Sequence, residues 1–409
     1  MKGFIGRLVI IKVTSILPIT EYLPKINRLL TTNNVVLQAE PGAGKSTALP
    51  LSLLDVEWLK GKKIVMLEPR RVAAKSIANY LAGKLGEKVG QRVGYQIKND
   101  RKISKDTVLE IVTEGILTRR LQNDPEMEGV GLIIFDEFHE RSLNGDLSLL
   151  LSLEVQQTIR DDLKLLVMSA TIDTTIMSEY MGGAEVIKCP GRTFPISVTH
   201  SDLKNQKLTD KVVSVLSSEI LDSPTGDILV FLPGQADIGR CIEAAQASIG
   251  SEACLFLPLY GGLSLTQQEQ ALVPDPDNKR RVVFTTNIAE TSLTIEGVTV
   301  VIDSGLEKTL VYDPASAMTR LETVYISKAS AVQRAGRAGR TQAGKCIRLW
   351  SEDRHRSFKE FQSEEIISAD LTGLLLELFQ WGAFEYEDIN WLTPPPRPHY
   401  ESARSMLEA

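Results

Sequence analysis

Short apolar runs recur along the first half of the chain and alternate with segments whose apolar residues have helical spacing. An apolar run of about four to eight residues is typical of a strand buried on both faces, and strands that alternate with helices form parallel sheets. The runs cover residues 35–38, 63–67, 108–112, 132–135 and 163–168. They predict an α/β domain with a doubly wound parallel sheet over residues 1–195.

The alternation is interrupted between Lys188 and His200, where two prolines and a glycine favour a boundary between domains. A second set of apolar runs follows at residues 227–232, 254–259, 281–285, 298–302 and 345–349. These runs predict a second doubly wound parallel sheet within residues 196–365. The rest of the chain, residues 366–409, is predicted to be a helical extension.

Three segments outside the two sheets carry their own patterns. β-branched and aromatic residues over 305–326 predict a hairpin that projects from the second domain, although an ordinary surface hairpin fits equally well. Residues 98–105 are polar and predict a solvated loop. Within the extension, a helix is predicted over 366–381, the prolines 394–396 should stop regular structure, and a second helical pattern begins at Tyr400.

Composition limits the classes of protein that fit. The chain has 43% hydrophobic and 24% charged residues and a formal net charge of −6, so any nucleic acid must bind in a local groove. Arg7 and Lys12 interrupt the apolar segment 1–18, which favours a strand or helix over a signal peptide. No apolar run has membrane-spanning length, so we expect a cytoplasmic protein without a membrane partner. Four cysteines without metal-ligand spacing predict buried thiols in a reducing compartment: Cys189, Cys241, Cys254 and Cys346.

A phosphate-binding loop follows the first apolar run. The glycines allow backbone N–H groups to surround phosphate oxygens, and a helix after the loop would present its positive end to the same anion. Lys45 would reach the β- and γ-phosphates, and the Ser46 hydroxyl would bind Mg²⁺. The predicted nucleotide-binding residues of the loop are Gly42, Ala43, Gly44, Lys45, Ser46 and Thr47.

Adjacent carboxylates follow the fourth apolar run, at the end of a strand where open α/β sheets bind their ligands. Asp136 is assigned to Mg²⁺ and to the nucleotide, and Glu137 is assigned as the general base that takes a proton from an attacking water. An acid pair at the start of a helix near Ser142 is the alternative interpretation, and the phosphate-binding loop upstream argues against it.

Arginines form two further candidate sites. Gln333, Arg337 and Arg340 are four and three residues apart, so on a helix they would share one face that suits a charged phosphate. A basic surface helix is the alternative. Arg70 and Arg71 follow the second apolar run and could bind a phosphodiester backbone, or they could be solvated residues at a helix start.

Seven strings in this order resemble the DEAH-box helicases of superfamily 2. Asp136-Glu137-Phe138-His139 followed by Glu140-Arg141-Ser142-Leu143 resembles the bacterial HrpB-type branch, with Phe138 in place of the usual alanine and outside both the metal and the base role. The resemblance spans residues 15–400. The strings are 42–47, 69–74, 113–115, 136–139, 169–171, 286–292 and 333–340.

The resemblance implies two tandem RecA-like domains with ATP and Mg²⁺ between them and a single nucleic-acid strand across both. RNA is the expected polymer ahead of DNA, movement is expected from 3′ to 5′, and the protein is expected to be a monomer. Gln333 would lie near the attacking water, Arg337 and Arg340 on the γ-phosphate, and Tyr80 against the adenine. The hairpin over 305–326 would help to part strands.

The resemblance also assigns residues that connect the nucleotide to the polymer. The coupling residues would be His139, Ser169 and Thr171, and the nucleic-acid-binding residues would be Arg70, Arg71, Thr113 and Thr286. Relatives continue with winged-helix and ratchet-like domains, and residues 366–409 are expected to lead towards a winged-helix domain that is missing here.

Two other functions compete with a motor. An ATP-binding clamp on nucleic acid or protein would need Lys45 but not the whole set of Glu137, Gln333, Arg337 and Arg340. A P-loop kinase for a small acceptor would leave the second sheet and its arginines without a task. The sequence therefore favours nucleic-acid-dependent ATP hydrolysis.

Overall fold

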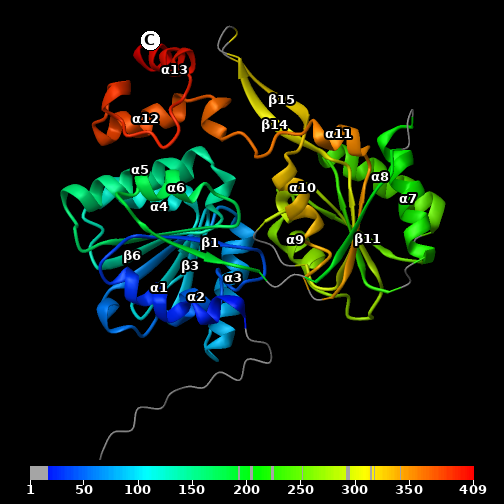
Figure 1. Ribbon diagram of the computed structural model, residues 1–409, viewed down its shortest axis with the longest axis horizontal. Coiled ribbons are helices and arrows are strands. Elements are labelled where there is room, and N and C mark those ends of the chain that lie inside the picture. Colours follow the sequence, from blue (N-terminus) through cyan, green and yellow to red (C-terminus); the bar gives the residue numbers. More distant parts are fainter. Residues whose placement is uncertain are drawn as a thin grey trace, which may run out of the picture.

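The computed structural model describes residues 17–409 except 192–193, 203–205, 223–224, 251, 292–294, 314–315, 317 and 341. The strand or helix expected over residues 1–18 lies almost entirely outside these described residues. Figure 1 shows two α/β units side by side, with a long hairpin and the C-terminal helices at one end of the molecule.

The first unit, here called the first domain, is built on an eight-stranded sheet in the order β4-β3-β5-β2-β6-β7-β1-β8. All neighbours are parallel except β3 and β4. The five strands that the apolar runs predict are present. The bounds are β1 Val35–Ala39, β2 Lys63–Leu67, β3 Val93–Ile97, β4 Asp100–Lys102, β5 Leu109–Val112, β6 Val130–Phe135, β7 Lys164–Ser169 and β8 Glu185–Cys189.

Helices cover both faces of this sheet. One hydrophobic core lies under α1 to α3, and a second lies under α4 to α6. The bounds are η1 Pro18–Glu21, α1 Leu23–Leu30, α2 Ala48–Ser52, η2 Glu57–Leu59, α3 Arg71–Lys84, α4 Glu114–Asn123, η3 Phe138–Glu140, α5 Leu143–Thr158 and α6 Thr174–Tyr180.

The second domain is built on a six-stranded sheet in the order β11-β12-β10-β13-β16-β9, in which every pair is parallel. Its strands are β9 Ile196–His200, β10 Asp227–Phe231, β11 Leu255–Leu259, β12 Arg281–Thr285, β13 Val298–Asp303 and β16 Gly344–Arg348. Its helices are α7 Leu208–Asp222, α8 Gln235–Ile249, α9 Leu265–Leu272, η4 Asn287–Ala289, α10 Lys328–Ala335 and α11 Glu352–Arg356. The chain passes from the first sheet to the second between β8 and β9, and the boundaries 1–195, 196–365 and 366–409 stay a prediction.

The hairpin predicted over 305–326 is present as β14 Leu306–Asp313 and β15 Met318–Tyr325, an antiparallel pair that projects beyond the second sheet (Figure 1). Gly305 precedes it with φ 72°, and a Cβ at this position would lie 2.6 Å from the Trp350 ring. Only glycine fits this turn, because the left-handed backbone and the ring both exclude a side chain.

The C-terminal extension packs on the first domain. Its elements are η5 Glu365–Ile367, α12 Thr372–Trp381, η6 Tyr386–Asp388 and α13 Arg397–Glu408. Leu375, Leu378 and Tyr400 are fully buried in the core that α4 and α5 share. The Tyr312 hydroxyl of the hairpin lies 3.0 Å from the Ser402 hydroxyl, so the extension connects the first domain to the hairpin.

Three predictions about local structure are wrong. The supposed loop over 98–105 contains β4, an edge strand whose charged side chains hide the strand pattern. The helix expected over 366–381 is divided, because Asp370 accepts a hydrogen bond from the Thr372 N–H and begins α12 anew. The last helix begins at Arg397 rather than Tyr400, since Pro398 is compatible with a first helical turn.

Two expectations about composition can be compared with the described residues. The four cysteines are free and buried. Within the described ranges, no helix is long and apolar enough to cross a membrane.

Candidate nucleotide and nucleic-acid site

The phosphate-binding loop connects β1 to α2. Gly42 and Gly44 have φ 82° and 94°, and a Cβ on Gly44 would lie 2.9 Å from a methyl carbon of Leu17. The loop therefore needs glycine for its backbone and for its packing. The helix after the loop, α2, begins at Ala48, and residues 45–47 form a turn before it. Its approach to a phosphate stays a prediction.

Lys45 contacts both carboxylates that end β6. Its Nζ donates to Glu137 Oε1 at 2.6 Å and lies 3.9 Å from Asp136 Oδ1, and all three side chains are buried. Glu137 has φ 52° and ψ 33°, a left-handed conformation that costs a non-glycine residue on the order of 1 kcal/mol. Strained backbone at this position fits a residue whose side chain must be aimed at a site.

The two carboxylates have opposite shifts of their pKa values. Burial raises the pKa of Asp136 to about 6. Burial also opposes the charged form of Glu137, but Lys45 first, together with His139 and Arg337, outweighs it and lowers the pKa of Glu137 to about 2. While Lys45 is bound to it, Glu137 is ionised but is a weak base.

Asp136 and Ser46 fit a bound Mg²⁺. Asp136 Oδ2 is buried and has no hydrogen-bond partner among the described residues, while the Ser46 hydroxyl bonds to the same carboxyl group. A free carboxylate oxygen beside a hydroxyl suits an ion that takes its remaining ligands from phosphate and water. The described residues contain no group of three or more His, Cys, Asp or Glu that could bind a metal without a nucleotide.

The second domain brings Arg337 and Arg340 towards Glu137. The charge of Arg337 helps to lower the pKa of Glu137. Burial lowers the pKa of Arg340 to about 10, and Glu137 opposes this shift. Arg337 Nε also donates to the Glu290 carbonyl oxygen at 3.0 Å. Gln333 is buried at the wall of the cavity between the domains.

The prediction that Gln333, Arg337 and Arg340 share one helical face is wrong. Helix α10 ends at Ala335, and residues 336–340 form turns and a bend. A Cβ on Gly339 would lie 2.7 Å from a carbon of Ile196. Gly339 thus allows this segment to pack closely on the start of β9, and Arg337 and Arg340 follow the end of the helix.

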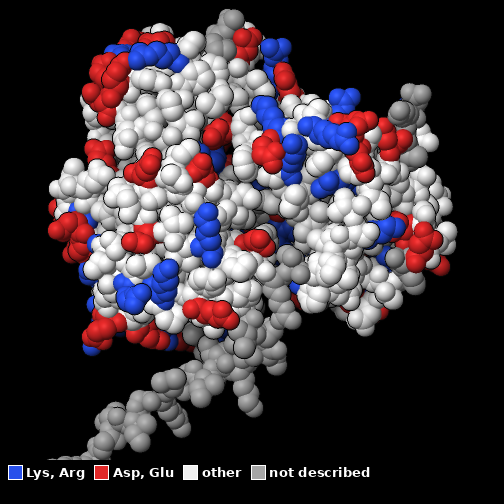
Figure 2. Space-filling model, viewed as in Figure 1, with Lys and Arg blue, Asp and Glu red and all other residues white. Residues whose placement is uncertain are grey.

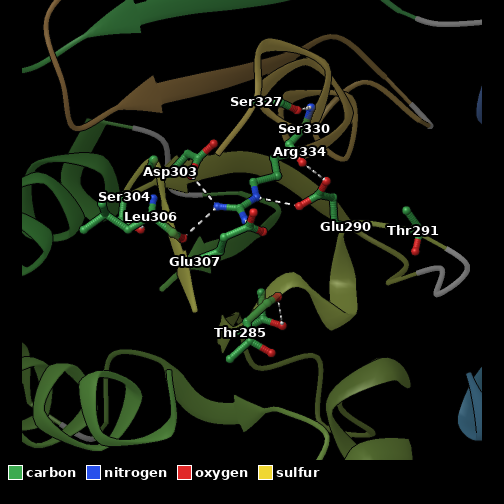
Figure 3. Close-up of polar contacts among 12 residues, drawn as sticks. Thr285, Glu290, Thr291, Asp303, Ser304, Leu306, Glu307, Ser327, Ser330 and Arg334 are labelled. Atoms are coloured by element: carbon green, nitrogen blue, oxygen red, sulfur yellow. Dashed lines mark hydrogen bonds and ion pairs between the residues drawn. The ribbon is translucent and has the colours of Figure 1, made fainter. Parts of the chain in front are cut away.

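Arg334, a residue that the sequence did not single out, is the centre of a buried polar cluster (Figure 3). It donates to Glu290 Oε2 at 2.8 Å and to Asp303 Oδ1 at 3.1 Å, and its guanidinium lies 3.6 Å from Glu307 Oε2. Ser330 also donates to Glu290. The cluster joins α10, β13, the base of the hairpin and the loop after β12. The sequence holds one indication of this residue: Arg334 lies in the string 333–340, but not on the helical face predicted for residues 333, 337 and 340.

The other predicted residues are placed as follows. His139 Nδ1 lies 3.5 Å from Glu137 Oε2, and the Ser169 hydroxyl donates to the Thr171 carbonyl at 3.1 Å. Among the described side chains, no hydrogen bond joins His139 to Ser169 or Thr171. Thr113 and Thr286 are half-buried residues that directly precede α4 and η4.

Two predicted residues are exposed. Arg71 begins α3 with its side chain towards solvent. Tyr80 lies on the same helix, 49% exposed, and Lys84 Nζ lies 5.2 Å from its ring centroid. Its contact with the adenine stays a prediction.

A cavity of about 690 Å³ lies between the two domains, the hairpin and the extension. Arg70 and Glu140 line it from the first domain, Thr291 from the second and Lys308 from the hairpin. Arg70 Nε donates to Glu140 Oε1 at 3.0 Å, and the Thr291 hydroxyl donates to the same oxygen. Sequence reasoning missed Glu140 and Thr291, although both lie inside or beside the strings that it quoted.

Charge on the face of the molecule that Figure 2 shows is mixed in sign. Figure 2 shows lysine and arginine gathered near the hairpin base and α11, next to acidic side chains, with both signs scattered over the rest of this face. A single strand would therefore be held by local contacts rather than by an overall positive field.

Two parallel α/β sheets, with a phosphate-binding loop and carboxylates on the first and arginines on the second, define a P-loop nucleoside triphosphatase with two RecA-like domains. The chain belongs to the DEAD/DEAH box helicases: the sequence profile of the DEAD/DEAH box helicase matches residues 24–178, and that of the helicase conserved C-terminal domain matches residues 210–342.

The chain is similar to named helicases. It is 45% identical over 395 residues to the ATP-dependent RNA helicase HrpB of Escherichia coli, which covers 96% of this chain and 49% of that protein. It is 35% identical over 400 residues to the probable ATP-dependent RNA helicase DHX34 of Homo sapiens, which covers 95% of this chain and 35% of that protein. The crystal structure of the E. coli DEAH/RHA helicase HrpB matches with a TM-score of 0.89 and 44% identity over 96% of this chain and 50% of that chain. The chain thus spans about half the length of HrpB.

Proposed function

We propose that this chain is the motor core of an ATP-dependent RNA helicase of the HrpB type. It would hydrolyse ATP when a single RNA strand is bound and would move along that strand from 3′ to 5′, as a monomer in the cytoplasm. The observation that carries the proposal is the position of Glu137: it lies beside Lys45 of its own domain and near Arg337 and Arg340 of the other. A site of this kind is complete only when the two domains are close.

The residues have separate tasks in hydrolysis. Lys45 leaves Glu137 for the phosphates, and the loss of this ion pair raises the pKa of Glu137, so that Glu137 becomes the base for the attacking water. Ser46 and Asp136 would hold Mg²⁺, which neutralises phosphate charge when bound. Arg337 and Arg340 stabilise charge on the γ-phosphate, and Gln333 orients the water. Thr47 and the backbone of residues 42–44 complete the phosphate contacts, and Tyr80 lies on the adenine.

The single strand would lie along the cavity between the domains. Arg70, Arg71, Thr113 and Thr286 would contact its phosphates and sugars, which carry little sequence information. RNA is proposed because relatives such as HrpB are named RNA helicases. His139, Ser169 and Thr171 would connect this strand to Glu137, since His139 already lies next to the Glu137 carboxylate.

The test is steady-state ATP hydrolysis by this chain alone, without polymer, with single-stranded RNA and with single-stranded DNA. Lys45→Ala is the blank, because it removes the cation that the phosphates need. We expect RNA to raise the rate above the level without polymer, and to raise it more than DNA does, with no effect in the blank.

The remaining outcomes contradict the proposal in different ways. ATP binding without turnover, with or without polymer, would indicate the clamp. Turnover that neither polymer changes would show an ATPase that is not coupled to nucleic acid. Greater stimulation by DNA would overturn the choice of RNA.

A further inference from the structure

One carboxylate oxygen connects the two domains at the wall of the large cavity. Glu140 Oε1 accepts a hydrogen bond from Arg70 Nε in the first domain at 3.0 Å and another from the Thr291 hydroxyl in the second. The ion pair of the Arg70 guanidinium is thus made with the carboxylate that also accepts from the second domain. Glu140 therefore belongs to a contact between domains rather than to the packing of one of them.

This contact involves Arg70, which is proposed above to bind the phosphates of the nucleic-acid strand. The side chains of Arg70 and Glu140 are about one-fifth exposed, at 20% and 21%, and both line the cavity. A phosphate in the cavity would meet Arg70 already paired with a carboxylate of similar geometry. Phosphate and carboxylate are alternative acceptors for the Arg70 Nε–H, so a phosphate that takes this donor displaces Glu140.

Thr291 extends this contact towards the nucleotide. It directly follows Glu290, whose carbonyl oxygen accepts from Arg337 Nε at 3.0 Å and whose carboxylate is held by Arg334. Two consecutive residues of the second domain thus contact Arg337 and the Arg70–Glu140 pair. A shift of Thr291 moves the carbonyl that positions Arg337.

We propose that Glu140 is a positioning residue that holds Arg70 away from nucleic acid and, through Thr291, transmits the arrival of a phosphate to the second domain. The inference rests on the proposed RNA-stimulated ATPase. When a phosphate of the strand binds Arg70, Glu140 loses its ion pair with Arg70 and keeps its hydrogen bond to Thr291. Binding of the strand therefore changes the contacts of the second-domain loop that positions Arg337.

Glu140→Gln distinguishes the contact with Arg70 from the contact with Thr291. The amide oxygen can still accept from Thr291, but the charge that holds Arg70 is lost. We expect the concentration of single-stranded RNA at half-maximal ATPase stimulation to fall by about fivefold, as for the loss of one competing ion pair. The slope of log affinity against log salt should become steeper by about 0.7, because in the parent the freed Glu140 carboxylate takes up a cation and offsets the one released from the phosphate, whereas the glutamine does not. A purely structural role would not move this slope.

Thr291→Val tests the hydrogen bond between Thr291 and Glu140. It keeps the shape of the side chain and the Arg70–Glu140 pair but removes the hydroxyl. Maximal stimulation by RNA should fall by about fivefold while half-saturation is unchanged, and Thr291→Ser should restore the parent value. Glu364→Gln is the matched control, because Glu364 lines the same cavity and pairs with Arg141 at 3.5 Å instead.

Two results would overturn the inference. The first is Glu140→Gln with unchanged or weaker RNA binding and the parent salt slope, and the second is Thr291→Val with full stimulation. RNA affinity is also measured by fluorescence anisotropy without ATP. If RNA does not stimulate the parent protein, the proposed function fails, whereas the anisotropy result for Glu140→Gln still decides whether Glu140 restrains Arg70.

Discussion

Replacement of Glu137 by glutamine tests the centre of the site, because it changes one atom and alters two properties. The amide cannot take a proton from water, and it cannot form an ion pair with Lys45, which now lies 2.6 Å from the Glu137 carboxylate. We therefore expect ATP hydrolysis to be lost while ATP binding is kept or becomes tighter.

The structure sets the size of both effects. Removal of a general base lowers turnover by roughly 10² to 10⁴. The pKa of Glu137, lowered to about 2 from an ordinary value of 4.5, corresponds to about 3 kcal/mol of net stabilisation of its charged form, against the cost of burial, and Lys45 is the first of the groups that supply it. Glutamine removes the competition of this carboxylate with a phosphate for Lys45, so we expect ATP to bind about tenfold more tightly.

Turnover is measured by phosphate release at saturating RNA, and binding by equilibrium titration of a fluorescent ATP analogue. Glu110→Gln is the control: Glu110 is also a buried carboxylate bound to a lysine, Lys63 at 2.6 Å, and we expect normal turnover from it. Hydrolysis by Glu137→Gln at the parent rate would falsify the assignment of the base. Weaker ATP binding would show that Lys45 does not compete between Glu137 and the nucleotide.

Stability against pH gives an independent check of the same pair. The folded pKa of Glu137 is below its unfolded value, so its contribution is present above about pH 4.5 and is lost as the pH falls towards 2. The parent should therefore lose more stability than Glu137→Gln over this window in thermal melts.

Two further predictions concern the second domain. Arg337→Lys removes the planar group that contacts the Glu290 carbonyl and approaches Glu137, so single-turnover hydrolysis should fall by about 10² or more with ATP affinity retained; a parent-like rate would exclude Arg337 from the phosphate site. Glu307→Gln should stabilise the protein at pH 8 by at most about 3 kcal/mol and have little effect near pH 4.5, because burial first and Glu290 second raise the pKa of Glu307 to about 7. The folded pKa is above the unfolded one, so this group costs stability as the pH rises through 7, and thermal melts that show the variant less stable at pH 8 would contradict the reasoning.

Strands with a clear apolar run could be predicted within a residue or two. The run at 281–285 matches β12, and the run at 63–67 matches β2. Four strands of the two sheets were missed. β4, β8 and β9 are edge strands with exposed or half-buried residues, so they have no apolar run. β3 is buried inside its sheet, but Gly94 and Gln96 interrupt its apolar residues.

The sequence by itself determined the chemistry of the site. A phosphate-binding loop, an acid pair after a buried strand and an arginine-containing string are local patterns, and each depends on residues within about ten positions of one another. Their order along the chain was enough to indicate two α/β domains and the family resemblance.

Only the tertiary structure decided which of these groups meet. Lys45 and Glu137 are 92 positions apart, and Glu140 and Thr291 are 151 apart, so no local pattern joins them. The pKa of Glu137 follows from such contacts, since burial and a neighbouring ammonium act through space. The close packing of Gly339 on Ile196, four residues beyond the end of α10 at Ala335, likewise joins segments that are far apart in the sequence. Periodicity describes one element at a time, whereas a site between two domains depends on how their surfaces fit together.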